Sequence, residues 1–374
     1  MHHRSFLYML IVLGGCCWSS ALSAQIESID HYVQLEMKKR RIPGVALVVI
    51  REREIAKMEG YGFANLEHDV RVSPDTVFEL ASLTKQFTAA AIMVLMEQNK
   101  LSLADSIMGY LPNSPEQWRA VTIRHLLTHT GGFPDPTNGF QSLREGGERT
   151  DYTTAQLFDA AKKDVMNFVP GERWQYSDVG YFLLGMIIER ASGQSYRGFL
   201  TRHFFAPLDM RSTSVLNQWA VLKNRAAGYT LRNGQIVNIR RVAQVELPSH
   251  FGIFSSVRDL AKWDNALRSG KVVKTSSLDQ MWMPVKLNSG ASYPYGFGWA
   301  MDGTGEHPII THDGITGTEY SRFPNDNLTV IVLTNLGRRR RDDTEVNSWG
   351  LTKEIAARLI PNIPKTRIKC KSLE

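Results

Sequence analysis

Ser82 and Lys85, three residues apart, carry side chains that could do chemistry together. They open residues 82–98, where alanine, leucine and methionine recur at helical spacing without proline or glycine. Residues three apart share one face of a helix, so the hydroxyl and the amine can meet. A lysine amine can take the proton of a serine hydroxyl when burial or a neighbouring cation lowers the lysine pKa. The spacing therefore predicts a nucleophile with its base at the start of a helix.

The same pair has a simpler explanation. Ser-x-x-Lys fixes two positions in four and recurs by chance in chains of this length. Serine is also a common N-cap residue, so Ser82 could cap the helix and do nothing else. In favour of chemistry, the unpaired N–H groups at a helix start suit a developing oxyanion. The other motifs of the chain have to decide between these interpretations.

Further segments resemble, in the same order, motifs of class C β-lactamases, D,D-peptidases and related esterases. Residues 174–185 resemble the second motif of that family, Tyr-x-Asn on a loop leading into a helix. In β-lactamases and penicillin-binding proteins the nucleophile itself lies in a Ser-x-x-Lys motif. The likeness extends from about residue 29 to about residue 359. The remaining segments that carry it are residues 126–132, 252–261, 295–299 and 312–314.

This resemblance implies a role for each matching position. Ser82 would attack a carbonyl, and Lys85 and Tyr176 would shuttle its proton. Tyrosine ionises near pH ~10, so only a cationic neighbour such as Lys85 would make Tyr176 a base at neutral pH. The backbone N–H groups of Ser82 and Ile315 would hold the oxyanion, and Gly314 would leave room for the substrate along its strand. Water would later release the acyl group from the serine.

Two places depart from the family pattern. Asp178 stands where many relatives have asparagine, so an acceptor replaces an amide that both donates and accepts hydrogen bonds. Asp178 could also hold Lys85 in its charged form and shift the burden of base to Tyr176. His312, counted with the catalytic residues, stands where lactamases usually carry lysine, and Asp313 where threonine often sits. Histidine is mostly neutral near pH 7, so a permanent anchor for a substrate carboxylate is missing and β-lactam hydrolysis is expected to be inefficient.

A sheet and a helical insert must position these side chains. The resemblance implies an α/β (α+β), β-lactamase/transpeptidase-like fold, with an antiparallel sheet flanked by helices and a mainly helical domain. Residues 25–80 and 286–374 are expected to form a discontinuous sheet domain, and residues 81–285 the helical domain, with the active site at the interface. Strands are expected at 45–50, through 61, and at 295–301, 309–313, 320–323 and 329–335. Helices are expected at 26–40, 82–98, 123–129, 154–164, 179–192, 257–269 and 346–359.

The first residues have the pattern of an export signal. A short charged start precedes an apolar stretch at residues 6–13, and small residues gather at 21–24. A signal over residues 1–24 predicts a periplasmic or secreted protein. Leu-Gly-Gly-Cys at Cys16 leaves lipid attachment as an alternative. No later segment reaches the ~20 apolar residues of a transmembrane helix, so none is expected.

Composition and charge exclude several other classes. The net charge of +7 is mild, and the arginine run at 338–341 is followed by two aspartates without interleaved aromatic residues, so no nucleic acid is expected as partner. His125 and His129 have a zinc-ligand spacing but lack the glutamate of His-Glu-x-x-His, so structural histidines are favoured. Lys274 begins a Lys-Thr-Ser that precedes, rather than follows, residues 295–299, and is treated as a decoy.

Two alternatives to the leading hypothesis stay open. One is a carboxylesterase or amidase that uses the same Ser82 acylation on neutral substrates. The other is a non-catalytic receptor for penicillins or peptidoglycan peptides. All three take a small-molecule or peptide substrate or ligand. The motifs already supply nucleophile, base and oxyanion donors, so no metal or organic cofactor is implied, and a monomer is expected.

Overall fold

The computed structural model describes residues 27–134, 151–217, 219–239, 244–337, 350–361 and 363. The expected signal at 1–24, Cys16 and the arginine run at 338–341 lie outside these residues. None of the helices in the described ranges combines the length and the hydrophobicity of a membrane span.

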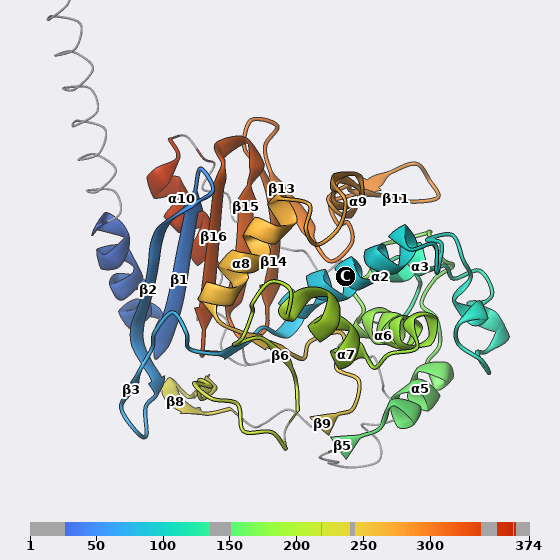
Figure 1. The fold of residues 1–374 in the computed structure, drawn as a ribbon, viewed down its shortest axis with the longest axis horizontal. Coiled ribbons are helices and arrows are strands. Elements are labelled where there is room, and N and C mark those ends of the chain that lie inside the picture. The colour runs from blue at the N-terminus through green and yellow to red at the C-terminus, as the bar shows by residue number, and fades with distance from the viewer. Residues whose placement is uncertain are drawn as a thin grey trace, which may run out of the picture.

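An antiparallel sheet of seven strands forms one side of the molecule (Figure 1). Its strand order is β13-β14-β15-β16-β1-β2-β3, so β1 lies between its hairpin partner β2 and the late strand β16. Both ends of the chain therefore build one sheet, which confirms the expected fold class. The strands are β1 (Gly44–Arg51), β2 (Glu54–Asn65), β3 (Val70–Arg71), β13 (Ala300–Gly303), β14 (Pro308–Gly314), β15 (Thr318–Phe323) and β16 (Leu328–Thr334).

Alternation along β1 gives the sheet two buried faces. Val45, Leu47 and Val49 pack with the helix at residues 27–40 and with α10 (Leu351–Leu359). The intervening residues, which include Val48, belong to the larger core on the opposite face, where α8 (Val257–Arg268) lies against the sheet. A strand buried on both faces reads as a continuous apolar run, as residues 45–50 do.

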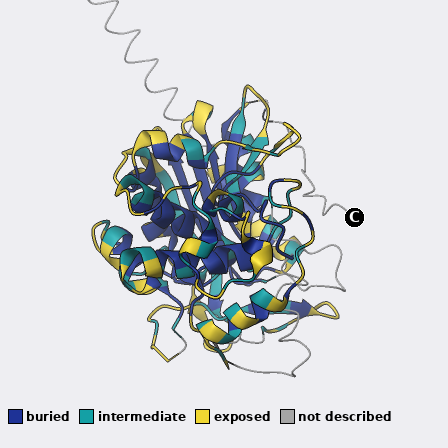
Figure 2. Cartoon of the chain, turned by 90° about the vertical axis from the view of Figure 1, so that its right-hand side faces the viewer, coloured by how far each residue is buried: buried dark blue, intermediate teal, exposed yellow. Residues whose placement is uncertain are grey.

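Apart from α8, α10 and the helix at residues 27–40, which cover the sheet, the helices lie with α2 (Thr84–Glu97) in the right-hand part of Figure 1. Helix α2 is buried almost all round and packs against α6 (Asp178–Ser192), which in turn packs against α3 (Ile123–Leu127). Figure 2 shows the buried residues filling the centre of the molecule and the exposed ones on outer helices and loops. The remaining α-helices are α5 (Thr154–Lys163), α7 (Tyr196–Leu200) and α9 (Thr275–Met281).

The expected helices within the described residues are present, with ends shifted by a few residues. The expected strand at 295–301 is wrong over most of its length, since only β13, from Ala300, is extended. Gly298 turns the chain with a φ of +75°, and a Cβ there would lie 2.7 Å from the Lys85 carbonyl oxygen. The segment is therefore a tight loop against α2. How the chain divides into domains stays a prediction.

Short strands that the sequence did not predict join the helical part. One sheet of three strands has the order β4-β10-β6, and three further pairs are β5-β9, β11-β12 and β7-β8. Their bounds are β4 (Phe78–Glu79), β5 (Asp151–Tyr152), β6 (Ser214–Val215), β7 (Tyr229–Arg232), β8 (Gln235–Asn238), β9 (Gln244–Val245), β10 (Ile253–Ser255), β11 (Val285–Lys286) and β12 (Ser292–Tyr293).

Candidate active site

Ser82 lies in a single 3-10 turn, η1 (Ala81–Leu83), between β4 and α2. The preceding residue, Ala81, has a φ of +49°, a left-handed conformation that residues with a side chain rarely adopt. Leu80 donates its N–H to the Ile253 carbonyl at 2.8 Å, which fastens the turn to β10. The N-cap positions of η1 and α2 are leucines, and neither helix has a side-chain cap. Ser82 is therefore not the helix cap of the simpler explanation.

The Lys85 side chain is fully buried beside this turn. Its Nζ lies 3.5 Å from the Ser82 Oγ and donates hydrogen bonds to the Asp178 Oδ1 at 2.7 Å and the His250 carbonyl at 2.8 Å. Burial is the largest influence on the Lys85 pKa and lowers it, while Asp178 opposes this by charge and hydrogen bond. The amine is thus held next to the hydroxyl and is easier to deprotonate than an exposed lysine.

Asp178 is the first residue of α6, where the helix dipole favours a carboxylate. Ser177 precedes it as N-cap, its Oγ accepting the Gly180 N–H at 3.4 Å. The structure thus places Asp178 against Lys85, as the sequence hypothesis required. The Asp178 side chain is 27% exposed, whereas that of Lys85 is fully buried, so solvent reaches the ion pair from the Asp178 side.

Tyr176 brings its ring to Lys85, with 4.7 Å between the Lys85 Nζ and the ring centroid. Burial first, and then the Asp178 charge, raise the pKa of Tyr176 well above its usual value, while the Ser82 side chain lowers it in part. The phenol oxygen is buried, and no hydrogen bond to it has good geometry among the described residues. Because the Tyr176 pKa moves up and the Lys85 pKa moves down, Lys85 is the more easily deprotonated of the two and is the group available as a free base.

His312, on β14, is buried and uses both ring nitrogens. Its Nδ1–H donates to the Asp313 carbonyl at 2.8 Å, so Nε2 is free of hydrogen and accepts the Tyr295 hydroxyl at 2.9 Å. Burial, and then the charge of Lys85, lower the His312 pKa to about 4. The imidazole is therefore neutral and orients Tyr295. Its ring centroid lies 6.3 Å from that of Tyr176.

Gly314 ends β14 next to η1, the turn that carries Ser82. A Cβ on Gly314 would lie 2.4 Å from the Leu80 carbonyl oxygen and 2.3 Å from the Thr318 Oγ1. The resemblance assigned this space to a substrate, but the structure fills it with the chain that carries Ser82. Ile315 follows Gly314 and is 43% exposed.

The model of the Beta-lactamase family matches residues 29–349 of this chain. The chain belongs to the Beta-lactamase family. Its family and its fold are those of β-lactamase-like serine hydrolases.

Individual proteins of known sequence or structure agree with this membership. The chain is 31% identical to Penicillin-binding protein 4* of Bacillus subtilis (strain 168) over 310 residues, which are 78% of the chain and 67% of that protein. It is 28% identical to Protein flp of Staphylococcus aureus (strain MW2) over 321 residues, 83% of the chain, and spans 63% of the length of that relative.

Two solved structures share the fold. The octameric penicillin-binding protein homologue from Pyrococcus abyssi aligns with a TM-score of 0.75 and 26% identity, over 89% of this chain and 77% of that one. EstCE1, described as a hydrolase with promiscuous acyltransferase activity, aligns with a TM-score of 0.76 and 21% identity, over 91% and 98%. Because the identity to EstCE1 is only 21%, this similarity concerns the fold alone.

The zinc interpretation of His125 and His129 finds no support in this Beta-lactamase family member. The Nδ1 of His125 accepts the Thr122 N–H at 3.2 Å, and that of His129 accepts the Ser177 N–H at 3.1 Å. Among the residues that the structure describes, no three His, Cys, Asp or Glu side chains gather as metal ligands would. Lys274, of the decoy motif, is exposed and precedes α9.

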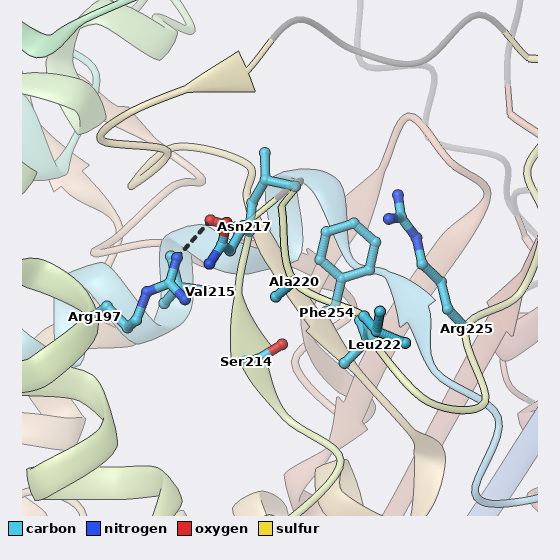
Figure 3. Close-up of a pocket in the computed structure, with 10 residues that line it drawn as sticks. Arg197, Ser214, Val215, Asn217, Ala220, Leu222, Arg225 and Phe254 are labelled. Carbon is cyan, nitrogen blue, oxygen red and sulfur yellow. Dashed lines mark hydrogen bonds between the residues drawn. The ribbon is translucent and has the colours of Figure 1, made fainter.

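A cavity of about 120 Å³ lies away from these groups, beside β6 and β10 (Figure 3). Arg197 and Arg225 stand on opposite sides of it, and Phe254 forms part of its wall. The Arg197 Nη2 donates to the Leu216 carbonyl at 2.8 Å. Ser214 is the only hydroxyl among the lining residues, and no lysine accompanies it. This cavity lacks the groups for acyl transfer, so the candidate active site of the Beta-lactamase family member is at Ser82.

Proposed function

We propose that this chain is a class C-like serine hydrolase that acts on amide or ester substrates through an acyl-serine at Ser82. The observation that carries the proposal is the fully buried Lys85 amine, 3.5 Å from the Ser82 hydroxyl oxygen. Because burial lowers the pKa of this amine, it can accept a proton under conditions in which an exposed lysine would not. The family likeness brings D-alanyl peptides and β-lactams as substrate classes.

The proposed reaction begins when Lys85 takes the Ser82 proton and the serine oxygen bonds to the substrate carbonyl carbon. The N–H groups of Ser82 and Ile315 donate to the resulting oxyanion. Tyr176 keeps its proton until the C–N or C–O bond breaks, gives it to the leaving group, and regains one from Lys85. Water then attacks the acyl-serine, and its proton passes through Lys85 to the departing serine oxygen. A carboxylic acid is released and the starting state returns.

A specific observation favours neutral esters and amides over substrates with a free carboxylate. His312 is buried and neutral, and both of its nitrogens are engaged within the protein. Its neighbour Asp313 is exposed on the same strand and carries a carboxyl group. A substrate carboxylate would therefore meet no fixed cation on β14 and would be close to a like charge. We expect neutral substrates to be turned over faster than penicillins.

The test compares a chromogenic short-chain ester, a D-alanyl peptide and a fluorescent penicillin on wild type and Ser82→Ala. Wild type should form an acyl adduct, seen in the intact mass, and release product, whereas Ser82→Ala should do neither. Ser214→Ala, which changes the serine of the other cavity, is the matched control and should behave as wild type. Labelling of wild type by penicillin without turnover of any substrate would instead identify a receptor.

Location and assembly belong to the same proposal. Export to the periplasm or beyond rests on the signal pattern at 1–24, and a monomer rests on the self-contained arrangement of Ser82, Lys85 and Tyr176 within one chain. The homologue from Pyrococcus abyssi is described as octameric, so an assembly is the outcome against which the monomer is tested. Light scattering of the purified protein separates the two.

A further inference from the structure

His129 holds the peptide groups on both sides of Tyr176. Its backbone carbonyl accepts the Gln175 N–H at 2.9 Å, and its Nδ1 accepts the Ser177 N–H at 3.1 Å. These two bonds come from one residue and fix the residue before and the residue after the tyrosine. The backbone at His129 has a φ of +59°, which turns its carbonyl and its side chain toward the same loop.

The imidazole also packs against the phenol ring itself. The ring centroids of His129 and Tyr176 are 4.4 Å apart with 36° between the planes. The same imidazole contacts Tyr295 at 4.8 Å and Tyr181 at 5.1 Å, so it lies among the aromatic rings next to the site. One buried residue, His129, which is 2% exposed, therefore binds both neighbours of Tyr176 and packs against the ring of Tyr176.

The hydrogen bond from Ser177 defines the form of the imidazole. Because Nδ1 accepts an N–H, the ring proton is on Nε2. A second proton would place a cation in a buried site near Lys85, and burial first, then the charge of Lys85, hold the His129 pKa well below its usual value. His129 therefore keeps its acceptor at Nδ1 throughout the neutral range.

We infer that His129 is a positioning residue, which fixes the Tyr176 hydroxyl for proton transfer by binding the N–H groups of Gln175 and Ser177 and by packing against the phenol ring. The inference rests on the proposed function, in which Tyr176 protonates the leaving group. The same role determines which residues could replace His129 without loss of activity. A residue at this position needs an acceptor at its δ atom and tolerance of a left-handed backbone, and asparagine meets both conditions.

The first test compares His129→Asn with His129→Leu and His129→Gln. Asparagine retains a δ acceptor, leucine has none, and glutamine moves its acceptor one atom farther out. We expect the acylation rate of Ser82 with the ester to fall about tenfold or more in the leucine and glutamine variants, with KM nearly unchanged, and to stay within a few-fold of wild type in the asparagine variant. Equal losses in all three variants would overturn the inference. Glutamine serves if the leucine variant does not fold.

The second test repeats the substitutions in a Tyr176→Phe background. If His129 acts through the phenol hydroxyl, the loss on His129→Leu or His129→Gln should largely disappear once that hydroxyl is gone. An undiminished loss would mean that His129 only supports the local structure, and would overturn the inference. Failure of the proposed function looks different, because wild type itself would then show no adduct on Ser82.

Discussion

Two regions of the molecule bury an ionisable group at the start of a helix, and they use it differently. At the active site, Lys85 has a carboxylate partner, Asp178, and a neighbouring hydroxyl, Ser82. At the junction of β15 with α10, Glu319 accepts hydrogen bonds from the Gly350 N–H and from the backbone N–H and the hydroxyl of Thr352, and this hydroxyl is buried. Both groups are almost fully buried.

The difference teaches what makes a buried charge chemically useful. Burial disfavours the charged form of each group, so it lowers the pKa of Lys85 and raises that of Glu319 to about 7. Of the two groups, only Lys85 lies beside a hydroxyl that is itself partly exposed, that of Ser82, and only there could the shifted proton pass to a substrate of the proposed reaction. Glu319 instead caps the helix that covers the outer face of the sheet. A perturbed pKa alone would have marked both as sites.

The largest expected effect comes from removing the amine of the first region. Lys85→Met keeps the length and the apolar stem of the side chain but has no proton acceptor. We expect the acylation rate to fall by roughly 10²- to 10⁴-fold, the usual contribution of a general base. Lys274→Met, in the exposed Lys-Thr-Ser motif, is the control and should leave the rate unchanged. Stopped-flow or mass-based adduct kinetics measure both, and similar rates in the two variants would contradict the assignment of Lys85.

A smaller effect should follow from changing the partner of the lysine. Asp178 raises the pKa of Lys85, so Asp178→Asn should lower that pKa further. The neutral amine would then persist to lower pH, and the acid limb of the acylation rate should move to lower pH, with a several-fold gain on that limb. Asp313→Asn removes a weaker influence of the same sign and should give a smaller shift. If the pH–rate profile of Asp178→Asn were the same as that of wild type, Asp178 would not control the pKa of the base.

Changing Glu319, in the second region, should have the smallest effect on activity. Its expected effect is on stability. The Glu319 pKa is about 7 in the folded protein against a usual 4.5, so the folded state binds the proton more tightly. The free energy of unfolding should therefore fall as pH rises from about 4.5 to about 7, by up to about 3 kcal/mol, and Glu319→Gln should lack this component. Denaturant unfolding across this window measures the slopes. If wild type and Glu319→Gln gave the same slope, Glu319 would not titrate in this window. The acylation rate of Ser82 should be the same in Glu319→Gln as in wild type.

The sequence predicted the part of the site that depends on local spacing. Ser82 and Lys85 are one helical turn apart. Tyr176 and Asp178 lie in one short segment, which resembles the second motif of the family. The structure brings these groups together from α2 and the start of α6, although they are 93 residues apart at Lys85 and Asp178. The sheet was likewise predictable from the β-branched runs at both ends of the chain.

The features that the sequence did not predict depend on contacts between residues far apart in the chain. His129 had no local signal for its contact with Ser177, which is 48 residues away. The loop with Gly298 looks extended in the sequence because its aromatic residues suit strands, and only its contact with the Lys85 backbone explains the turn. The direction of the Tyr176 and Lys85 pKa shifts also depends on how deeply each group is buried, which composition does not reveal.

The position of β1 in the sheet affects how the chain can fold. Val45 lies opposite Thr334, so the strand made first along the sheet waits for one of the strands made last. Until residues 328–334 emerge from the ribosome, β1 has an apolar edge with unpaired backbone groups, which favours aggregation. Closure across so long a stretch of sequence is intrinsically slow. A growing chain of this protein therefore keeps its central sheet incomplete until residues 328–334 have been made, which is compatible with the export proposed above.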